Sequence, residues 1–285
     1  MRSSALRALE GFSLAAARTW LTRGTRAARF VVGETVRAAA ESERRVNFWD
    51  LARGFAVNES VVIPSGSWED GGTSPLERYL LALLIRYFKP ASILEIGTFR
   101  GISTRLILEN SSAPTQVYTM DLPPERDFSQ LAAGTDKALV LHSKVGVEFQ
   151  DHPERARVTQ ILGNSLEANT WATLPERIDF AFIDASHSYE AVKNDTERAR
   201  EKLKPGAVIV WHDYTAEDSY ERDVGRYIRE QMRSHKNIFV VPSTSLAIQI
   251  PQGELESAGA RISKFFHAGD FATRRPGGFA PWLNQ

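Results

Sequence analysis

The chain has 285 residues, 42% of them apolar, so it can bury one large core, and one domain with extensions is the simplest organisation. Because 35 Lys and Arg residues balance 35 Asp and Glu residues, no overall positive field attracts nucleic acid, and we expect no nucleic-acid partner. The absence of cysteine excludes disulfides and thiolate metal sites and suits a cytoplasmic protein, and no apolar run approaches the roughly 20 residues that span a bilayer.

The segment Met1–Gly33 differs in composition from the rest of the chain, because it carries six arginines and a single acid, Glu10. Its apolar residues recur at helical spacing, at Leu9, Phe12, Ala16 and Trp20. We therefore expect residues 1–45 to form a basic amphipathic helical extension that packs on its own domain or on a second subunit of a homo-oligomer. Peripheral membrane contact and a cleaved targeting segment are the alternatives.

A helix is predicted to begin at Ser74, because a serine cap, Pro75 and Glu77 follow the pattern of a capping box with a first-turn proline. The helix should run to about Phe88, where Lys89-Pro90 stops it. The preceding loop, residues 65–73, is placed either to close over a ligand or to serve a structural role.

The next predicted feature is a buried strand that breaks into a tight turn and opens a helix, over Ile93–Gly101. Gly97 and Gly101 allow torsions and close approaches that a side chain would block, and such a turn is where a parallel sheet binds a nucleotide-like ligand. Phe99 stands where a dinucleotide fingerprint has its second glycine, so a ligand without phosphates fits better.

The stretch Leu94-Glu95-Ile96-Gly97-Thr98 resembles motif I of class I methyltransferases that use S-adenosylmethionine (SAM), in the form found in small-molecule O-methyltransferases. The resemblance implies that Glu95, Gly97, Thr98 and Gly101 bind SAM. The helix predicted over Ile102–Glu109 points its N-terminus at the ligand, which favours the carboxylate of the methionine moiety.

Two further strand ends extend the predicted SAM site. The strand Gln116–Met120 ends in Asp121, about 24 residues after Gly97, close to the distance at which an acid reaches a ribose hydroxyl. The strand Val158–Leu162 ends in Gly163-Asn164-Ser165, and we expect Asn164 and Ser165 to meet the adenine, although a plain turn would have the same sequence.

The remaining pattern alternates strands and helices. Strands are predicted over Ile178–Ile183 and Ala207–Trp211, and an antiparallel edge pair over 238–242 and 246–250. The fold predicted is α/β, a doubly wound Rossmann-like sheet of seven mostly parallel strands with one antiparallel strand, preceded by the N-terminal helical extension. We expect the domain to cover residues 46–251 and a C-terminal tail to cover 252–285.

Two strands end in polar residues that suit a metal ion, namely Asp184 and the pair His212-Asp213. If these strands are neighbours, about 4.8 Å apart, the carboxylates converge and need a proton, a basic partner or a metal ion. Oxygen ligands favour Mg²⁺, or Mn²⁺ if His212 also binds. Because adjacent residues of a strand point to opposite faces, His212 and Asp213 can share an ion only if the strand ends in a turn there.

Over about residues 75–250 the chain resembles the metal-dependent class I O-methyltransferases, which include catechol and caffeoyl-CoA methyltransferases. It resembles most the bacterial branch that modifies sugars and natural products, through Asp-x-x-His-Ser-Tyr at Asp184–Tyr189 and Trp-His-Asp-Tyr at Trp211–Tyr214. The resemblance implies that Asp184, His212 and Asp213 bind the metal and that His187 is the general base. Relatives carry Asp-Asn or Glu-Asp in place of His212-Asp213, which leaves the metal and its requirement open.

The predicted function is transfer of a methyl group from SAM to a hydroxyl of a small-molecule acceptor, with a divalent metal assisting. Two alternatives from other classes are a non-haem oxygenase with Fe²⁺ at His212, Asp213 and Asp184, and a catalytically idle SAM-binding module.

Overall fold

The computed structural model describes residues 44–55, 60–65, 72–123, 144–214, 222–257 and 262–263. Residues 45–262 form one compact unit, and residues 1–44 with 263–285 are assigned to another. The predicted helix within residues 1–33 lies outside the described residues, so it stays a prediction. Within the described ranges no helix is long and apolar enough to cross a membrane.

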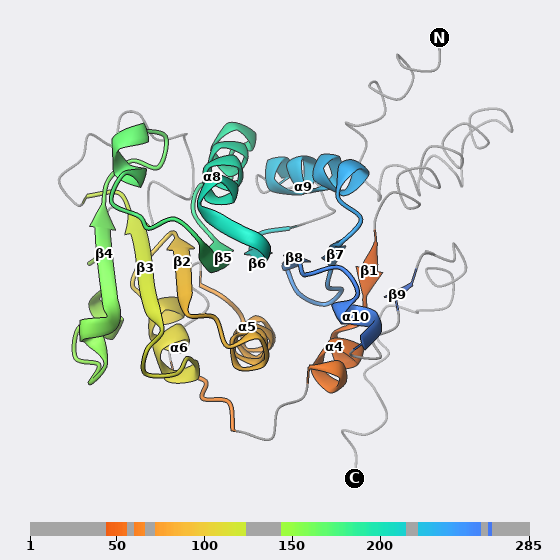
Figure 1. Cartoon of the computed structure of the whole chain (residues 1–285), viewed down its shortest axis with the longest axis horizontal. Coiled ribbons are helices and arrows are strands. Elements are labelled where there is room, and N and C mark those ends of the chain that lie inside the picture. Colours follow the sequence, from red (N-terminus) through yellow and green to blue (C-terminus); the bar gives the residue numbers. More distant parts are fainter. Residues whose placement is uncertain are drawn as a thin grey trace, which may run out of the picture. The chain divides into compact units, whose positions relative to one another are not determined.

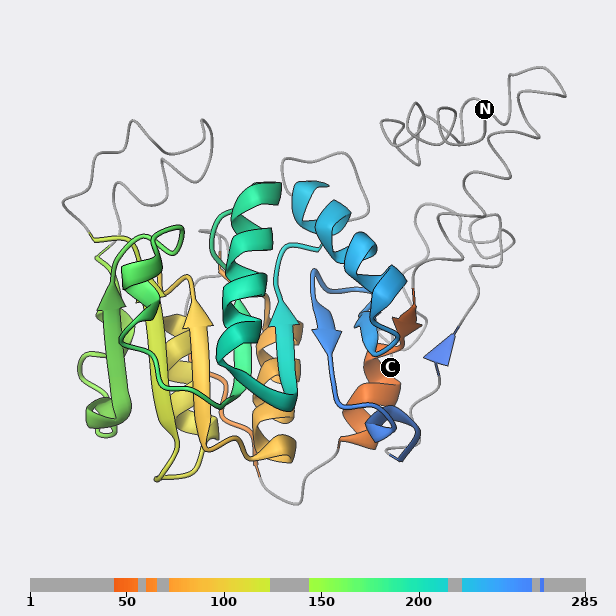
Figure 2. The same ribbon diagram turned by 45° about the horizontal axis from the view of Figure 1, so that its top comes forward.

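The compact unit is built on one mixed sheet, whose strand order in the described part of the chain is β4-β3-β2-β5-β6-β8-β7-β1-β9 (Figure 1). The strands are β1 Arg45–Val46, β2 Ser92–Ile96, β3 Gln116–Asp121, β4 Val158–Leu162, β5 Ile178–Ile183, β6 Leu203–Trp211, β7 Ile238–Val240, β8 Ala247–Gln249 and β9 Ile262–Ser263. Strands β2 to β6 pair in parallel, and β8 is antiparallel to both β6 and β7 (Figure 2). The predicted Rossmann-like sheet with one reversed strand is confirmed, and two short strands extend it.

One detail of the predicted sheet is wrong. We expected β7 and β8 to form a pair at the edge, whereas the short strands β1 and β9 follow β7, so β7 is not an edge strand. The antiparallel pairing itself is as predicted, with Phe239 opposite Ile248. The position of β8 agrees with its burial, because Ala247 and Ile248 have no exposed surface.

Helices cover both faces of the sheet. Those of the described residues are α4 Phe48–Gly54, α5 Pro75–Phe88, α6 Ile102–Asn110, α8 Tyr189–Lys202, α9 Arg222–Ser234 and α10 Glu254–Ser257, with short 3₁₀ turns at Val147–Phe149, Arg155–Arg157 and Ala168–Trp171. Figure 1 places α5 and α6 on one face and α8 and α9 on the other. The predicted start of α5 is confirmed, because the Ser74 and Glu77 side chains form both bonds of the capping box.

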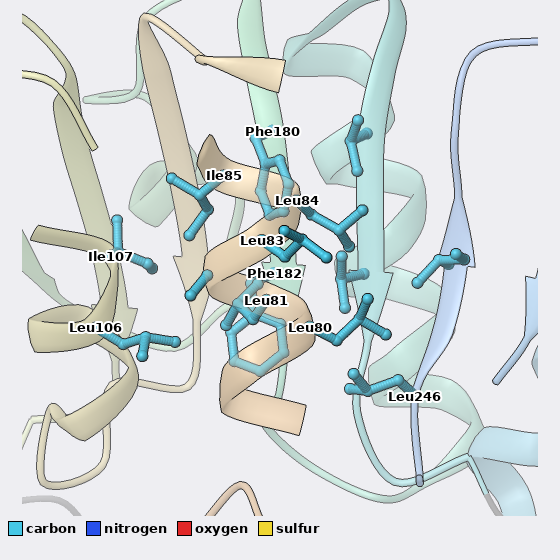
Figure 3. Close-up of a cluster of buried hydrophobic side chains, with 14 of the residues drawn as sticks. Leu80, Leu81, Leu83, Leu84, Ile85, Leu106, Ile107, Phe180, Phe182 and Leu246 are labelled. Carbon is cyan, nitrogen blue, oxygen red and sulfur yellow. The ribbon is translucent and has the colours of Figure 1, made fainter. Parts of the chain in front are cut away.

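Apolar side chains fill the space between each helical layer and the sheet. Alternating residues of β5 serve both layers, because Phe180 and Phe182 belong to the cluster under α5 and α6 while Ala181 and Ile183 belong to the cluster under α8 and α9. Leu80, Leu81 and Leu84 of α5 lie among the side chains of the first cluster (Figure 3). This packing fixes α5 against the strands whose ends carry the predicted site.

The parallel strands end together at one edge of the sheet. Ile96 of β2 pairs with Met120 of β3 and with Ile183 of β5, and Ile183 pairs with Trp211 of β6. The residues that follow these strands therefore meet at one edge, where open α/β sheets bind their ligands.

Candidate functional site

The turn after β2 packs closely against the end of β5. The Gly97 N–H donates to the Met120 carbonyl at 2.8 Å, and Gly97 has φ +100, a conformation that favours glycine. A Cβ at Gly97 would lie 1.8 Å from the Asp184 carbonyl oxygen. At Gly101, the N-cap of α6, a Cβ would lie 2.5 Å from the Phe149 ring. Both glycines thus permit close approaches within the chain itself, and ligand contact at them stays a prediction.

Glu95 is fully buried at the end of β2, and the hydrogen bonds that it accepts from the described residues reach one of its two oxygens. Its Oε2 accepts hydrogen bonds from the hydroxyls of Thr104 and Thr119, each at 2.5 Å. Burial raises the pKa of Glu95 to about 7, although these hydrogen bonds oppose the shift. Its Oε1 has no hydrogen-bond partner among the described residues. Thr98, which was also predicted to bind SAM, is buried as well, and its hydroxyl oxygen lies 2.6 Å from the hydroxyl oxygen of Thr119.

Asp121 lies beside the turn that follows β2. Its Oδ2 accepts from the Phe99 N–H and its Oδ1 from the Leu122 N–H, both at 2.6 Å. A carboxylate has about four acceptor positions, so these bonds leave capacity for a ribose hydroxyl. The structure therefore brings Asp121 next to motif I, and its contact with the ribose stays a prediction.

Asn164 and Ser165 follow β4 at the same edge, because the Gly163 N–H donates to the Asp121 carbonyl at 2.8 Å. The Asn164 side chain accepts from the Leu166 N–H at 3.0 Å. The Ser165 carbonyl accepts from the Trp171 indole at 2.7 Å and from the Asn194 amide at 2.8 Å. These bonds fix the turn, and its predicted contact with adenine stays a prediction.

Asp184, His212 and Asp213 converge at the ends of β5 and β6. His212 Nδ1 lies 3.1 Å from Asp184 Oδ1 and 3.1 Å from Asp213 Oδ1, and one ligand atom from each residue lies within 4.8 Å of the others. Asp213 has φ 58, in the left-handed region, so the chain turns and both side chains of the pair reach one point. The turn that shared binding requires is therefore present.

The electrostatics of this cluster reflect two carboxylates around one buried imidazole. Burial lowers the pKa of His212, but the charges of Asp184 and Asp213 raise it more, so the result is well above 6.5. Burial raises the pKa of Asp184. Burial also raises the pKa of Asp213, but the charge of His212, the hydrogen bond from His187 and the charge of His187 bring that pKa below its ordinary value.

The three side chains fit a small divalent cation. Neighbouring ligands of an octahedral ion bound at about 2.1 Å lie about 3.0 Å apart, which matches the spacing of His212 Nδ1 from both carboxylates. His212 Nδ1 is buried and makes no hydrogen bond to the described residues, as expected for an atom that faces a cation.

His187 lies on the other side of Asp213. Its Nε2 is 2.8 Å from Asp213 Oδ2, so Asp213 contacts both histidines, one with each carboxylate oxygen. Ser188 then caps α8 by accepting from the Ala191 N–H at 3.3 Å. The structure brings the predicted base to the predicted metal ligands.

Glu77 was expected only as a helix cap, yet it also contacts the cluster. Its Oε2 lies 3.3 Å from His212 Nε2, and both side chains are only 7% exposed. The sequence did offer one signal for this location of Glu77. Because α5 directly precedes β2 and packs beside it, the first turn of α5 lies at the edge of the sheet where ligands bind.

The sequence of residues 94–214 matches a family described as methyltransferase domain. The matched range begins in β2 and ends just after β6, so it covers the parallel part of the Rossmann-like sheet. Over these residues the chain is similar to a methyltransferase domain. All the predicted site residues, from Glu95 to Asp213, lie inside the matched range, whereas Glu77 lies outside it.

Individual similar proteins are distant. Uncharacterized protein R132 of Acanthamoeba polyphaga mimivirus is 29% identical over 146 residues, which cover 50% of this chain and 62% of the viral protein. Cofactor-bound Rv0187 from MTB is 22% identical with a TM-score of 0.47, covering 71% of this chain and 89% of that one. A putative caffeoyl-CoA O-methyltransferase from Staphylococcus aureus is 19% identical with a TM-score of 0.47, covering 66% and 86%.

Proposed function

We propose that this methyltransferase domain transfers the methyl group of SAM to a hydroxyl of a small-molecule acceptor, with a divalent cation assisting. The observation that carries the proposal is the position of Asp184. Its backbone packs against Gly97 of the motif I turn, while its side chain lies 3.1 Å from His212 in the cation cluster. The predicted methyl donor site and the predicted acceptor site therefore adjoin at one residue.

In the proposed complex, SAM occupies the edge formed by the ends of β2, β3 and β4. The Asp121 carboxylate accepts from the ribose, and the α6 N-terminus faces the methionine carboxylate. The other proposed cofactor contacts are Glu95, Gly97, Thr98, Gly101, Asn164, Ser165 and Asp184.

The chemistry requires alignment and removal of one proton. The acceptor oxygen attacks the methyl carbon, the carbon–sulfur bond breaks as the carbon–oxygen bond forms, and S-adenosylhomocysteine leaves with the electron pair. The hydroxyl proton passes to His187. An ionised Asp213 carboxylate can only accept a hydrogen bond, so neutral His187 carries its proton on Nε2, the nitrogen that faces Asp213. The other ring nitrogen, Nδ1, then accepts the proton of the acceptor hydroxyl.

Asp184, His212 and Asp213 would hold the cation, with Mg²⁺ or Mn²⁺ as the ions that suit this donor set. The bound ion would supply a positive charge that makes a nearby hydroxyl more acidic. The oxygenase alternative is less well supported, because the facial triad of non-haem iron enzymes has two histidines and one carboxylate, whereas this cluster has one histidine and two carboxylates.

The test is methyl transfer from labelled SAM to a panel of catechols and vicinal diols, with Mg²⁺ or with chelator. We expect turnover that Asp184→Asn abolishes together with cation affinity. His187→Ala should retain SAM and cation affinity and lose about 10² to 10⁴ in single-turnover rate, the usual contribution of a general base.

The panel also separates the alternatives. If SAM binds but no acceptor is methylated under any metal condition, the domain is an idle SAM-binding module. If His187→Ala reacts as fast as wild type at every pH, His187 is structural and the base lies elsewhere.

A further inference from the structure

We propose that Glu77 is a positioning residue that holds the His212 ring so that Nδ1 faces the cation. The inference deepens the proposed function and rests on its cation site. Glu77 lies in the first turn of α5, on the far side of His212 from the two carboxylate ligands. It is also separate in sequence from the matched methyltransferase segment.

The Glu77 carboxylate is surrounded by donors. Its Oε2 accepts from the Ser74 N–H at 2.6 Å and lies 3.3 Å from His212 Nε2. Its Oε1 accepts from the Ser245 N–H at 2.6 Å and from the Ser245 hydroxyl at 2.8 Å. Donors face both oxygens. Burial raises the pKa of Glu77, but the nearby His212 and these hydrogen bonds bring it below its ordinary value, so the environment favours the ionised, accepting carboxylate.

An acceptor opposite Nε2 determines which ring nitrogen of His212 carries hydrogen. Nε2 must hold the proton, and the lone pair of Nδ1 is then available toward Asp184 and Asp213, each 3.1 Å away. A ring turned over would put a carbon atom toward the ion and lose the bond to Glu77. Metal-binding histidines commonly donate their second N–H to a carboxylate, which fixes both the tautomer and the ring orientation.

Glu77 is itself held by two parts of the fold. Ser74 belongs to the α5 cap, and Ser245 lies in the turn between β7 and β8. On another side, the Phe182 ring packs edge-on against the His212 ring, with centroids 6.4 Å apart. The orientation of His212 is therefore set by residues that do not touch the cation.

The test compares Mn²⁺ binding to the full chain for wild type, Glu77→Gln and the control Ser74→Ala. A glutamine side chain has one acceptor oxygen and one NH₂ donor. Whichever way the amide is turned, its nitrogen faces other donors, either those of Ser245 or those of Ser74 and His212. Ser74→Ala removes the hydroxyl of the same cap but keeps all the donors to Glu77. Two readouts are used: calorimetric affinity, and the nitrogen modulation that a coordinated imidazole produces in pulsed electron paramagnetic resonance of bound Mn²⁺.

We expect Glu77→Gln to weaken Mn²⁺ binding about 10- to 100-fold and to reduce the nitrogen modulation, as losses of outer partners of metal ligands usually do. Ser74→Ala should lower the melting temperature and leave both readouts as in wild type. If Glu77→Gln retains wild-type affinity and modulation, the inference is wrong while the cation site stands. If wild type binds no Mn²⁺, or binds Mn²⁺ that Asp184→Asn does not remove, the cation site itself is wrong. The inference then fails with it.

Glu77→Gln also changes the cap of α5, so a measurement on the wild-type protein guards against misfolding. Nitrogen-15 spectra of histidine in the Mg²⁺-loaded protein, with His212 assigned through His212→Asn, report which nitrogen carries hydrogen. We expect the proton on Nε2. A proton on Nδ1 of His212 would overturn the proposal whether or not Glu77→Gln folds.

Discussion

One backbone torsion, at Asp213, decides whether the cation cluster can form. In an extended strand His212 and Asp213 would point to opposite faces of the sheet. With φ 58, Asp213 leaves the strand geometry and brings its carboxylate to 3.1 Å from His212 Nδ1. Aspartate is among the residues that adopt this conformation at low cost, so the residue type serves both the turn and the proposed ligation.

At Asp121, the proposed ribose contact predicts a selective loss of affinity. Asp121→Ala should weaken binding of S-adenosylhomocysteine by about 1 to 3 kcal/mol, the usual loss of a hydrogen bond to a charged group. The substitution also removes the bond to the Phe99 N–H, which can loosen the motif I turn. A ligand analogue without the two ribose hydroxyls separates these effects, and calorimetry should give it equal affinity for both proteins. An equal loss for both ligands would assign Asp121 to the turn alone.

At Glu95, burial predicts a stability change with pH. The pKa of Glu95 is about 7 in the folded chain, above its ordinary value of 4.5, so the folded state binds the extra proton between these values. The stabilisation is complete below pH 4.5 and is lost as pH rises through 7, and the difference between these two pKa values corresponds to about 3 kcal/mol.

Glu95→Gln tests this change, because the amide keeps an acceptor for Thr104 and Thr119 and cannot ionise. In urea unfolding without SAM, the free energy of unfolding of the variant should rise relative to that of wild type by about 3 kcal/mol between pH 4.5 and pH 8. Other titrating groups cancel in the comparison. A constant difference between the two proteins would mean that Glu95 is ionised in the folded chain throughout.

Among single residues, the sequence predicted the site residues at the ends of strands, but it did not predict their contacts with residues far away in the sequence. Asp121, Asp184 and His212 could be found because each directly follows an apolar strand. The His212–Glu77 contact joins residues 135 apart in sequence, and the sequence indicated only that the first turn of this helix lies at the ligand edge. The capping box explained Glu77 locally, so its second contact depends on how α5 packs against β6, which the sequence does not contain.

Among elements, the contact of the β2 turn with the end of β5 predicts an unusual intolerance of a methyl group. Gly97 and Gly206 both have positive φ, but a Cβ at Gly97 would meet the Asp184 carbonyl oxygen at 1.8 Å, whereas nothing lies within 4 Å at Gly206. Gly206→Ala should cost about 1 to 2 kcal/mol for the backbone alone. Gly97→Ala should cost that amount and a further 1 to 3 kcal/mol, roughly, for the clash.

Denaturant unfolding of the two glycine variants, with Mn²⁺ affinity measured in parallel, checks this. Because the clash is with the backbone of Asp184, Gly97→Ala should also weaken cation binding, and Gly206→Ala should not. Equal costs for the two variants would mean that the turn moves away from β5 without resistance.

The position of β8 shows where pattern reasoning reached its limit for elements. The strands Ile238–Val240 and Ala247–Gln249 are both short and apolar, so the sequence predicts an antiparallel pair but not which member joins β6. Both strands are buried in the sheet, because β1 pairs with β7 on its outer side. The two-residue strand β1 carries no pattern that would have predicted this cover.

At the scale of the whole molecule, the site collects residues from the ends of β2, β3, β4, β5 and β6 and from the first turn of α5. All of them fall within the compact unit of residues 45–262. The balanced charge of the chain gives no general attraction to polyanions, so the proposed recognition of SAM and of an acceptor depends on this local arrangement. The predicted limits of the domain at residues 46 and 251 stay predictions.

The same unit predicts the effect of removing Met1–Gly33. Because no candidate site residue lies in that segment, the shortened chain should bind SAM with the affinity of the full chain in calorimetry. Light scattering and liposome sedimentation then separate the two hypotheses for the basic helix: loss of an oligomer supports subunit packing, and loss of liposome binding supports membrane contact. A full-length control, Leu9→Asp with Phe12→Asp, removes the apolar stripe without shortening the chain and should reproduce whichever loss is seen. If the shortened chain fails to fold, the segment contributes to the core, and both hypotheses are wrong.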